Sequence, residues 1–175
     1  MSLTHRLATS ADLPILTGLM DAAIGALQRG YLDEAQITAS RKLMGLDTQL
    51  VADGTYFLVE TDGRVAGCGG WSRRATLYGG DHSPGRDAAL LDPATDAARV
   101  RAMYTHPDFA RRGVGRLILS LCEAAARAAG FKRVELAGTL SGQPLYEACG
   151  YTVIEAFKDA RGGVPVPLLR MGKAL

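Results

Sequence analysis

Apolar residues recur at helical spacing in two long segments of the chain. The first begins at Thr9 or Ser10, either of which can cap a helix. Its apolar positions are Leu13, Leu16, Met20, Ala23 and Leu27. The second covers residues 114–129, keeps its apolar side chains on one side and ends at Gly130. The pattern predicts two helices that each pack one face against a core.

Two further helices are predicted to be shorter. Asp33 is a suitable N-cap for a helix over residues 34–44, and Gly45 is a suitable stop. The apolar face of this helix is poor. Residues 143–149 predict a short helix that ends at Gly150.

Seven runs of apolar residues predict strands. They cover residues 3–7, 55–60, 64–72, 99–105, 133–137, 151–157 and 165–171. Asp62-Gly63 separates the second run from the third and is a favourable hairpin turn. The chain therefore reads as a hairpin, a strand-helix-strand unit, and a helix with a closing strand pair. This order predicts an α/β protein whose mixed sheet carries helices on both faces.

Composition limits the class of protein. The 175 residues suit one domain, residues 1–175, and 47% of them are hydrophobic, as in a globular protein with a real core. The formal net charge is +2 and the basic residues are scattered, which does not indicate a nucleic-acid face. No apolar run approaches the roughly 20 residues of a membrane helix, and the N-terminus lacks a signal-peptide pattern. We expect a cytoplasmic protein with no membrane or nucleic-acid partner.

The cysteines and histidines form no recognisable metal or disulfide pattern. The three cysteines are odd in number and lack Cys-x-x-Cys spacing. Cys68 falls in a predicted strand and Cys122 on the apolar stripe of a helix, so we interpret both as buried thiols. The three histidines are dispersed along the chain. We therefore expect no metal site.

The corner between the strand at residues 99–105 and the helix at residues 114–129 has the sequence Ala-Arg-Arg-Gly-Val-Gly-Arg, residues 110–116. Backbone N–H groups at a helix N-terminus lack carbonyl partners, glycines let a ligand approach the backbone, and arginines supply positive charge. These features favour a diphosphate-binding site. The alternative is simple turn chemistry with arginines that face water.

Two other nucleotide motifs fit this corner less well. A Walker A loop requires Gly-Lys-Ser/Thr, whereas the chain has Val114-Gly115-Arg116. A dinucleotide fingerprint requires a third glycine where Ile118 stands, although Glu135 lies at a suitable spacing for its acid. A nicotinamide-dependent enzyme is therefore the weaker interpretation, and hydrolysis of a nucleoside triphosphate is not expected.

Two segments resemble the GNAT superfamily of acetyl-CoA-dependent N-acetyltransferases. Residues 103–115 are similar to the family's cofactor motif, in which a strand and a Pro-containing turn precede a (Gln/Arg)-x-x-Gly-x-(Gly/Ala) loop. Further along, residues 141–151 are similar to the family's Phe-Tyr-Glu-x-x-Gly-Phe element. The chain departs from the family at Ala110, where Gln or Arg is frequent, and at Ser141, where many relatives have Asn.

The resemblance implies the GNAT fold, which is a mixed, mostly antiparallel sheet of six to seven strands splayed at the centre. It also implies acetyl-CoA as co-substrate, with the pantetheine arm paired like an added strand against residues 103–105. The cofactor-binding residues that it implies are Met103, Tyr104, Thr105, Ala110, Arg111, Arg112, Gly113, Val114, Gly115, Arg116, Ser141 and Tyr146. No metal takes part.

The resemblance further implies direct acetyl transfer to a primary amine of a small molecule or a protein, in a ternary complex. Tyr146 matches the family's general acid, which protonates the leaving thiolate. A lysine-like amine, with a pKa near 10.4, must first lose a proton, at a cost of about 4.6 kcal/mol at pH 7. Glu60 is the first candidate for the base, and Asp81 and His82 are the others.

The acceptor and the function class stay open at this level. Residues 75–97 form an unusually long Gly-, Pro- and Asp-rich connection, either a surface insertion or a lid beside the acceptor site. Tyr31, Tyr56, Trp71 and Tyr78 either line an aromatic or cationic pocket or pack in the core. The resemblance suggests an enzyme that forms a homodimer. The alternative function is an acyl-CoA-binding sensor without turnover.

Overall fold

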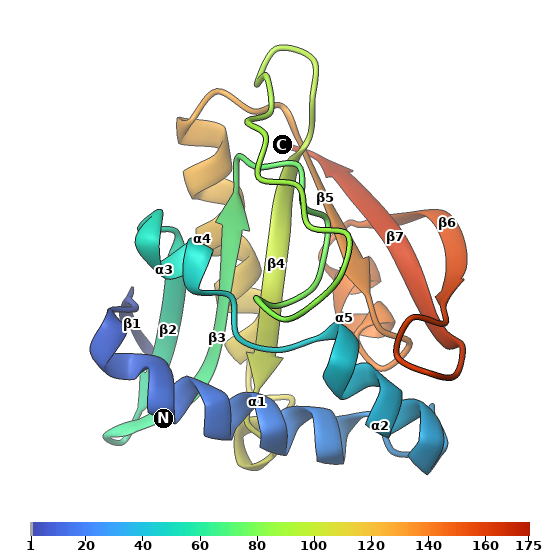
Figure 1. The fold of residues 1–175 in the computed structure, drawn as a ribbon. Helices are drawn as coiled ribbons and strands as arrows, with labels where there is room; N and C mark the ends of the chain where they lie inside the picture. Colours follow the sequence, from blue (N-terminus) through green and yellow to red (C-terminus); the bar gives the residue numbers. More distant parts are fainter. Residues whose placement is uncertain (1) are drawn as a thin grey trace.

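A computed structural model describes residues 2–175 and shows a seven-stranded sheet in the order β1-β2-β3-β4-β5-β7-β6 (Figure 1). The strands are β1 (Thr4–Leu7), β2 (Tyr56–Thr61), β3 (Arg64–Ser72), β4 (Ala98–Thr105), β5 (Arg133–Gly138), β6 (Thr152–Asp159) and β7 (Val166–Ala174). Neighbouring strands are antiparallel except β4 and β5, which are parallel. The structure thus confirms the predicted mixed, mostly antiparallel sheet.

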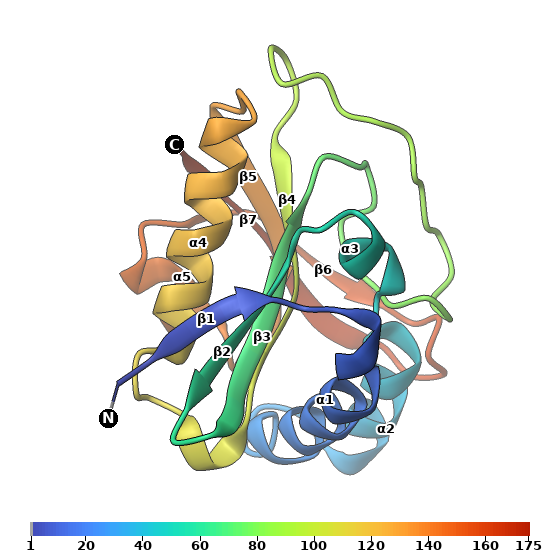
Figure 2. The ribbon, with the colours of Figure 1, turned by 90° about the vertical axis from the view of Figure 1, so that its left-hand side faces the viewer.

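The helices cover both faces of this sheet, as the sequence predicts. They are α1 (Leu13–Leu27), α2 (Glu34–Leu43), α3 (Thr48–Ala52), α4 (Val114–Ala128) and α5 (Gln143–Ala148). Figure 2 shows α4 and α5 on one face and α1, α2 and α3 on the other. The sequence pattern does not predict the short α3, because only one side chain marks its start. This side chain is the N-cap Asp47, which accepts a hydrogen bond from the Gln49 amide at 3.1 Å.

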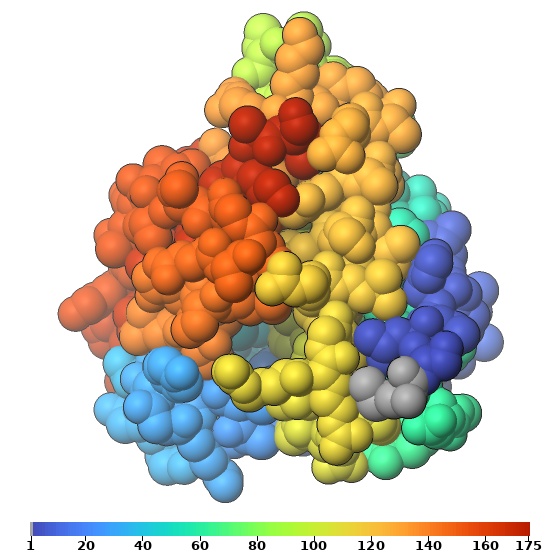
Figure 3. All heavy atoms as spheres, turned by 180° about the vertical axis from the view of Figure 1, so that it is seen from behind, coloured from blue at the N-terminus to red at the C-terminus, as the bar shows by residue number. Residues whose placement is uncertain are grey.

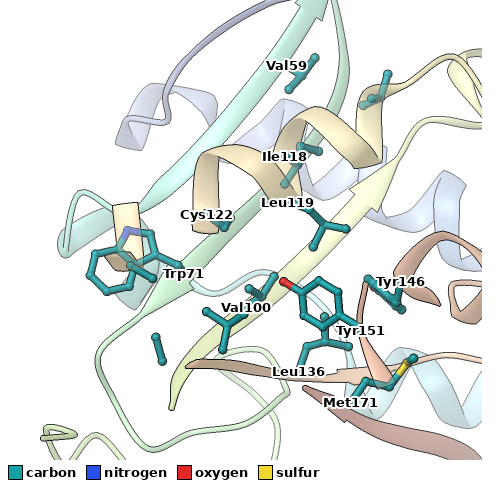
Figure 4. Close-up of a cluster of buried hydrophobic side chains, with 14 of the residues drawn as sticks. Val59, Trp71, Val100, Ile118, Leu119, Cys122, Leu136, Tyr146, Tyr151 and Met171 are labelled. Carbon is teal, nitrogen blue, oxygen red and sulfur yellow. The ribbon is translucent and has the colours of Figure 1, made fainter. Parts of the chain in front are cut away.

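Two apolar layers hold the helices to the sheet. On one face, α4 buries Ile118 and Cys122 in the cluster drawn in Figure 4. On the other face, α1 buries Leu16 and Met20 against the strands, where Cys68 is also enclosed. Both cysteines have no exposed surface, which confirms the prediction of buried thiols at these two positions.

Among the described residues, one helical segment, which contains α1, is apolar over a greater length than expected from the sequence. By length and composition alone, Ser10–Leu27 is sufficient to cross a membrane. In this structure Leu16 and Met20 of the same segment are buried in the core beside the sheet. The apolar character of α1 is therefore used in packing.

The sheet opens at its centre. β4 and β5 pair only where Ala98 meets Val134 and Arg99 meets Glu135. Beyond this point β4 stays paired with β3, and β5 with β7. Within the described chain, the edge of β4 that faces β5 therefore has no strand partner over residues 100–105. This is the splayed centre that the resemblance implies.

Candidate active site

β4 bends where the sheet opens. Ala102 and Met103 together lie opposite Gly69 of β3, and Ala102 has a φ of +51°. A non-glycine residue in this conformation costs of order 1–3 kcal/mol and persists only where its surroundings hold it. The buried Tyr56 hydroxyl donates a hydrogen bond to the Ala102 carbonyl oxygen at 2.8 Å. Tyr56 therefore supports the bend from within the core.

We expect Tyr56→Phe to lower the free energy of unfolding by about 1–3 kcal/mol, because it leaves the Ala102 carbonyl without its donor. Urea denaturation followed by circular dichroism measures the change. Tyr31→Phe is the matched control, since it removes the same hydroxyl from a residue that is 52% exposed. The control should change stability by less than about 0.5 kcal/mol. Equal effects in the two variants would contradict the supporting role of Tyr56.

The corner after β4 leaves the first turn of α4 open. Arg111 and Gly113 both have left-handed backbone conformations, with φ of +62° and +86°. The first hydrogen bond into this corner runs from the Leu117 amide to the Gly113 carbonyl oxygen at 3.0 Å. The amides that come before Leu117 lie in the first helical turn. Such amides have no carbonyl oxygen four residues earlier in the helix to bond to. A Cβ atom added to Gly113 would meet no heavy atom within 4 Å, so space for a ligand lies beside it.

The two glycines of the corner have different roles. Gly113 is required by its positive φ, which side chains disfavour. A Cβ atom at Gly115 would lie 2.6 Å from Cδ2 of Leu145 on α5. Gly115 also lines the cavity, so its backbone stays a predicted contact of the ligand. Leu145 fills the position of its missing Cβ atom, so this glycine also lets α4 and α5 pack closely.

A cavity of about 670 Å³ runs along the free edge of β4 and past this corner. Its walls come from β4, the corner, α5 with the residues before it, α1, and two connections on the α1 face. Figure 3 shows the surface hollowed between the corner (yellow), the region of α5 (orange) and α2 (light blue). A volume of this size is typical of small-molecule sites.

Ten of the twelve predicted cofactor-binding residues line the cavity. They are Met103, Tyr104, Thr105, Ala110, Arg111, Gly113, Gly115, Arg116, Ser141 and Tyr146. Val114 is not among the lining residues, because its side chain is 1% exposed and packs in the core. Arg112 is not among them either, and its guanidinium lies 5.8 Å from the centroid of the Phe109 ring. The fold thus brings the two segments of the resemblance to one space.

Tyr146 projects from α5 into the cavity wall. Its ring packs against Gly138 and Gly142, and it meets the Tyr151 ring edge-on with 6.1 Å between centroids. Burial raises the pKa of Tyr146 to about 12, so the phenol is protonated at neutral pH. Within residues 2–175, its hydroxyl makes no hydrogen bond. The phenol is therefore a donor available to a ligand.

Glu60 lies away from this site. Its Oε1 accepts a hydrogen bond from Nε of Arg6 at 3.1 Å, and it does not line the cavity. β3 separates β2 from the opening beside β4, and the guanidinium on β1 draws the carboxylate toward the outer edge of the sheet. The structure therefore corrects the expectation that Glu60 faces the acceptor.

The other two candidate bases, Asp81 and His82, hold the long connection in place. Asp81 accepts a hydrogen bond from the Thr48 hydroxyl at 2.8 Å. Nε2 of His82 lies 3.0 Å from the carbonyl oxygen of Arg41. Neither side chain lines the cavity. Both act at the contact between the connection and the helices of the α1 face.

A buried ion pair also anchors the connection to β4. Arg101 lies 2.6 Å from Asp47, and the two side chains are 1% and 0% exposed. Arg101 also donates to the Gly79 carbonyl oxygen at 2.6 Å, and Arg86 lies 3.1 Å from Asp47. Removing one partner of such a pair leaves a buried charge without compensation. Sequence reasoning missed Arg101, because a single arginine in an apolar strand carries no motif.

A second anchor holds Tyr78, which lines the cavity. Its hydroxyl donates to Oδ2 of Asp159 at 2.7 Å, and Arg161 lies 2.6 Å from the same carboxylate. The Arg161 guanidinium, followed by the Tyr78 hydroxyl, lowers the pKa of Asp159 to about 2. Tyr31 lines the cavity too, whereas Trp71 is core. The long connection is thus a fixed wall of the cavity.

Comparison with known proteins agrees with this geometry. The sequence matches the family model described as Acetyltransferase (GNAT) family over residues 20–151. No curated protein sequence matches the chain.

Solved structures share the fold at low sequence identity. A GCN5-related N-acetyltransferase from Rhodopseudomonas palustris has a TM-score of 0.73 and 18% identity, covering 100% of this chain and 97% of its own. The PaiA N-acetyltransferase from Thermoplasma acidophilum, solved with coenzyme A, has a TM-score of 0.67 and 14% identity, covering 100% of both chains. YncA from Salmonella typhimurium, solved with acetyl-CoA, has a TM-score of 0.65 and 18% identity, covering 100% and 95%.

The open mixed sheet with helices on both faces is the fold that these acetyltransferase structures share. The chain belongs to the GNAT acetyltransferase family.

Proposed function

We propose that this protein transfers the acetyl group of acetyl-CoA to a primary amine of a small molecule or a protein. One observation carries the proposal. The free edge of β4, the open corner at Gly113 and the Tyr146 phenol all face one cavity. The family assignment and the coenzyme-A complexes of two similar structures support the same activity.

The residues present fit coenzyme A. The first-turn amides of α4, with Arg111 and Arg116 nearby, suit the diphosphate, because N–H groups and the helix dipole favour an anion there. The unpaired edge of β4 over residues 100–105 suits the amides of the pantetheine arm. The thioester supplies an activated acetyl carbon for the amine to attack.

Tyr146 supplies the proton in the proposed reaction. As the C–N bond forms and the C–S bond breaks, the electron pair of the C–S bond goes to the sulfur. The Tyr146 hydroxyl gives its proton to that sulfur and regains one from water. The attacking nitrogen becomes positively charged as the C–N bond forms, and it gives its extra proton to water, which leaves the neutral amide. General acid catalysis of this type contributes about a hundredfold to ten-thousandfold in rate.

The experiment is a turnover assay with two readouts. Purified protein is mixed with acetyl-CoA and an amine. A thiol reagent reports the release of free coenzyme A, and mass spectrometry measures the mass of the amine product. The proposal expects stoichiometric thiol and acetylated amine. Thiol release without acetylated amine would indicate hydrolysis, and coenzyme-A binding without either product would favour the sensor. Cytoplasmic location and homodimer formation stay predictions from the sequence.

A further inference from the structure

The part of the cavity on the α1 face has mostly apolar and aromatic walls. They come from the end of α1 and the residues that follow it, the connection between α2 and α3, and the start of the long connection after β3. Figure 2 shows α1, α2 and α3 on this face of the sheet. The side chains are Ala23, Ile24, Leu27, Tyr31, Met44, Leu77 and Tyr78. These walls favour an apolar group, because a charged group buried among them would lose its water without meeting an opposite charge.

The charged residue in this region is already neutralised. Arg101 lines the cavity, and its guanidinium lies 2.6 Å from the fully buried Asp47 carboxylate. That carboxylate also faces Arg86 at 3.1 Å, so its negative charge is shared by two cations. Among the described residues, no aspartate or glutamate lines the cavity. A second ammonium on an acceptor would therefore lose water without gaining a counter-charge.

Gln28 is the polar exception in these walls. It caps the C-terminus of α1, lines the cavity and is only 4% exposed. Its Oε1 is buried and has no hydrogen-bond partner within residues 2–175. Buried polar atoms are nearly always paired, so an unpaired amide oxygen beside a ligand cavity points to a donor that the ligand supplies. A half-turn about the last side-chain bond of a glutamine exchanges the positions of Oε1 and Nε2, and the role assigned here to Oε1 requires the orientation in which it faces the ligand.

We infer that the acceptor is an amine carried on an apolar group, and that Gln28 accepts a hydrogen bond from its N–H. This rests on the proposed acetyltransferase function. Gln28 is then a specificity-determining residue, because it replaces one hydrogen bond that the amine loses when it leaves water. The apolar walls receive the rest of the molecule.

The first arm of the test compares two amines of equal length, hexylamine and 1,5-diaminopentane. They differ in one end, which is a methyl group in the first and an ammonium in the second. Isothermal titration calorimetry on protein saturated with coenzyme A should show at least tenfold tighter binding of hexylamine, and kcat/KM should follow the same order. Equal binding, tighter binding of the diamine or no binding of either would overturn the inference.

The second arm uses Gln28→Met, which keeps the length of the side chain and removes the amide. We expect KM for hexylamine to rise about tenfold, the value for one lost hydrogen bond to an amine. KM for acetyl-CoA should not change. Because no internal hydrogen bond of the Gln28 oxygen is lost, the melting temperature should stay the same or rise. An unchanged KM for hexylamine would overturn the role of Gln28.

Gln49→Met is the matched control for this variant. The Gln49 amide donates to Asp53 at 2.9 Å and does not line the cavity, so the same substitution should lower the melting temperature and leave both KM values unchanged. The calorimetric arm also separates two failures. If hexylamine binds in a Gln28-dependent way but is never acetylated, the proposed function fails while the inference about the amine site stands.

Discussion

Gly113→Asp should abolish coenzyme-A binding while the protein stays folded. The new carboxylate would lie beside the first-turn amides of α4, where the proposal places the diphosphate. Two unit charges about 4 Å apart repel by about 4 kcal/mol at the effective dielectric of a protein surface. The apo protein has room for the side chain, because a Cβ atom here meets no heavy atom within 4 Å. Calorimetric titration with coenzyme A measures the loss.

Gly113→Asn is the matched control for that variant. Asparagine has the shape of aspartate without its charge, and both residues tolerate the left-handed φ of +86° better than most others. Strain at the turn should therefore be similar in the two proteins. We expect the Asn variant to retain measurable binding, with a Kd roughly 1,000-fold lower than that of the Asp variant, the ratio that corresponds to about 4 kcal/mol. Wild-type affinity in the Asp variant would show that the diphosphate does not bind at this corner.

The elements that the sequence predicts well are those with local signals. The one-sided apolar pattern of α4 is sustained over several turns, and the structure buries Ile118 and Cys122 of that face. Asp62-Gly63 specifies the β2–β3 hairpin within two residues, and both have the positive φ that such turns require. Patterns of this kind need no information from distant parts of the chain.

What the sequence does not predict depends on contacts between distant residues. Glu60 lies near the end of a strand, and the sequence gives no sign that Arg6, 54 positions earlier, pairs with it outside the site. Arg101 and Asp47 carry no motif, and only the closed fold shows them as a buried pair. Gln28 is likewise one polar residue at the end of an apolar helix. Its burial beside the cavity, with the amide oxygen unpaired, becomes visible only in the folded chain.

The different surroundings of Gly113 and Gly115 also depend on a contact between residues far apart in the sequence. Gly113 and Gly115 look equivalent in a Gly-x-Gly motif, which specifies backbone freedom but not what occupies the adjacent space. Leu145 of α5 fills the space at the second glycine. The same motif therefore serves the open corner and the helix packing together, and an added Cβ atom would meet open space at Gly113 alone of the two glycines.

Tyr146→Phe should lower kcat by about a hundredfold to ten-thousandfold, the usual contribution of a general acid. Burial raises the pKa of Tyr146 to about 12, which keeps the proton on the phenol throughout the neutral range. Titration of this group therefore removes no activity until the pH approaches that value. Affinity for coenzyme A should change little, because in the proposed reaction the hydroxyl acts only when the sulfur leaves. Stopped-flow measurement of thiol release gives kcat, and calorimetry gives the affinity.

Tyr151→Phe is the control for this last variant. Tyr151 meets the Tyr146 ring edge-on, is 2% exposed and does not line the cavity. Its hydroxyl is buried away from the cavity, so its removal should change kcat by less than about twofold. The two variants delete the same atom from neighbouring rings, one facing the cavity and one facing the core. A kcat that falls equally in both would reflect disturbed packing around α5, and an unchanged kcat in Tyr146→Phe would remove the phenol from the reaction.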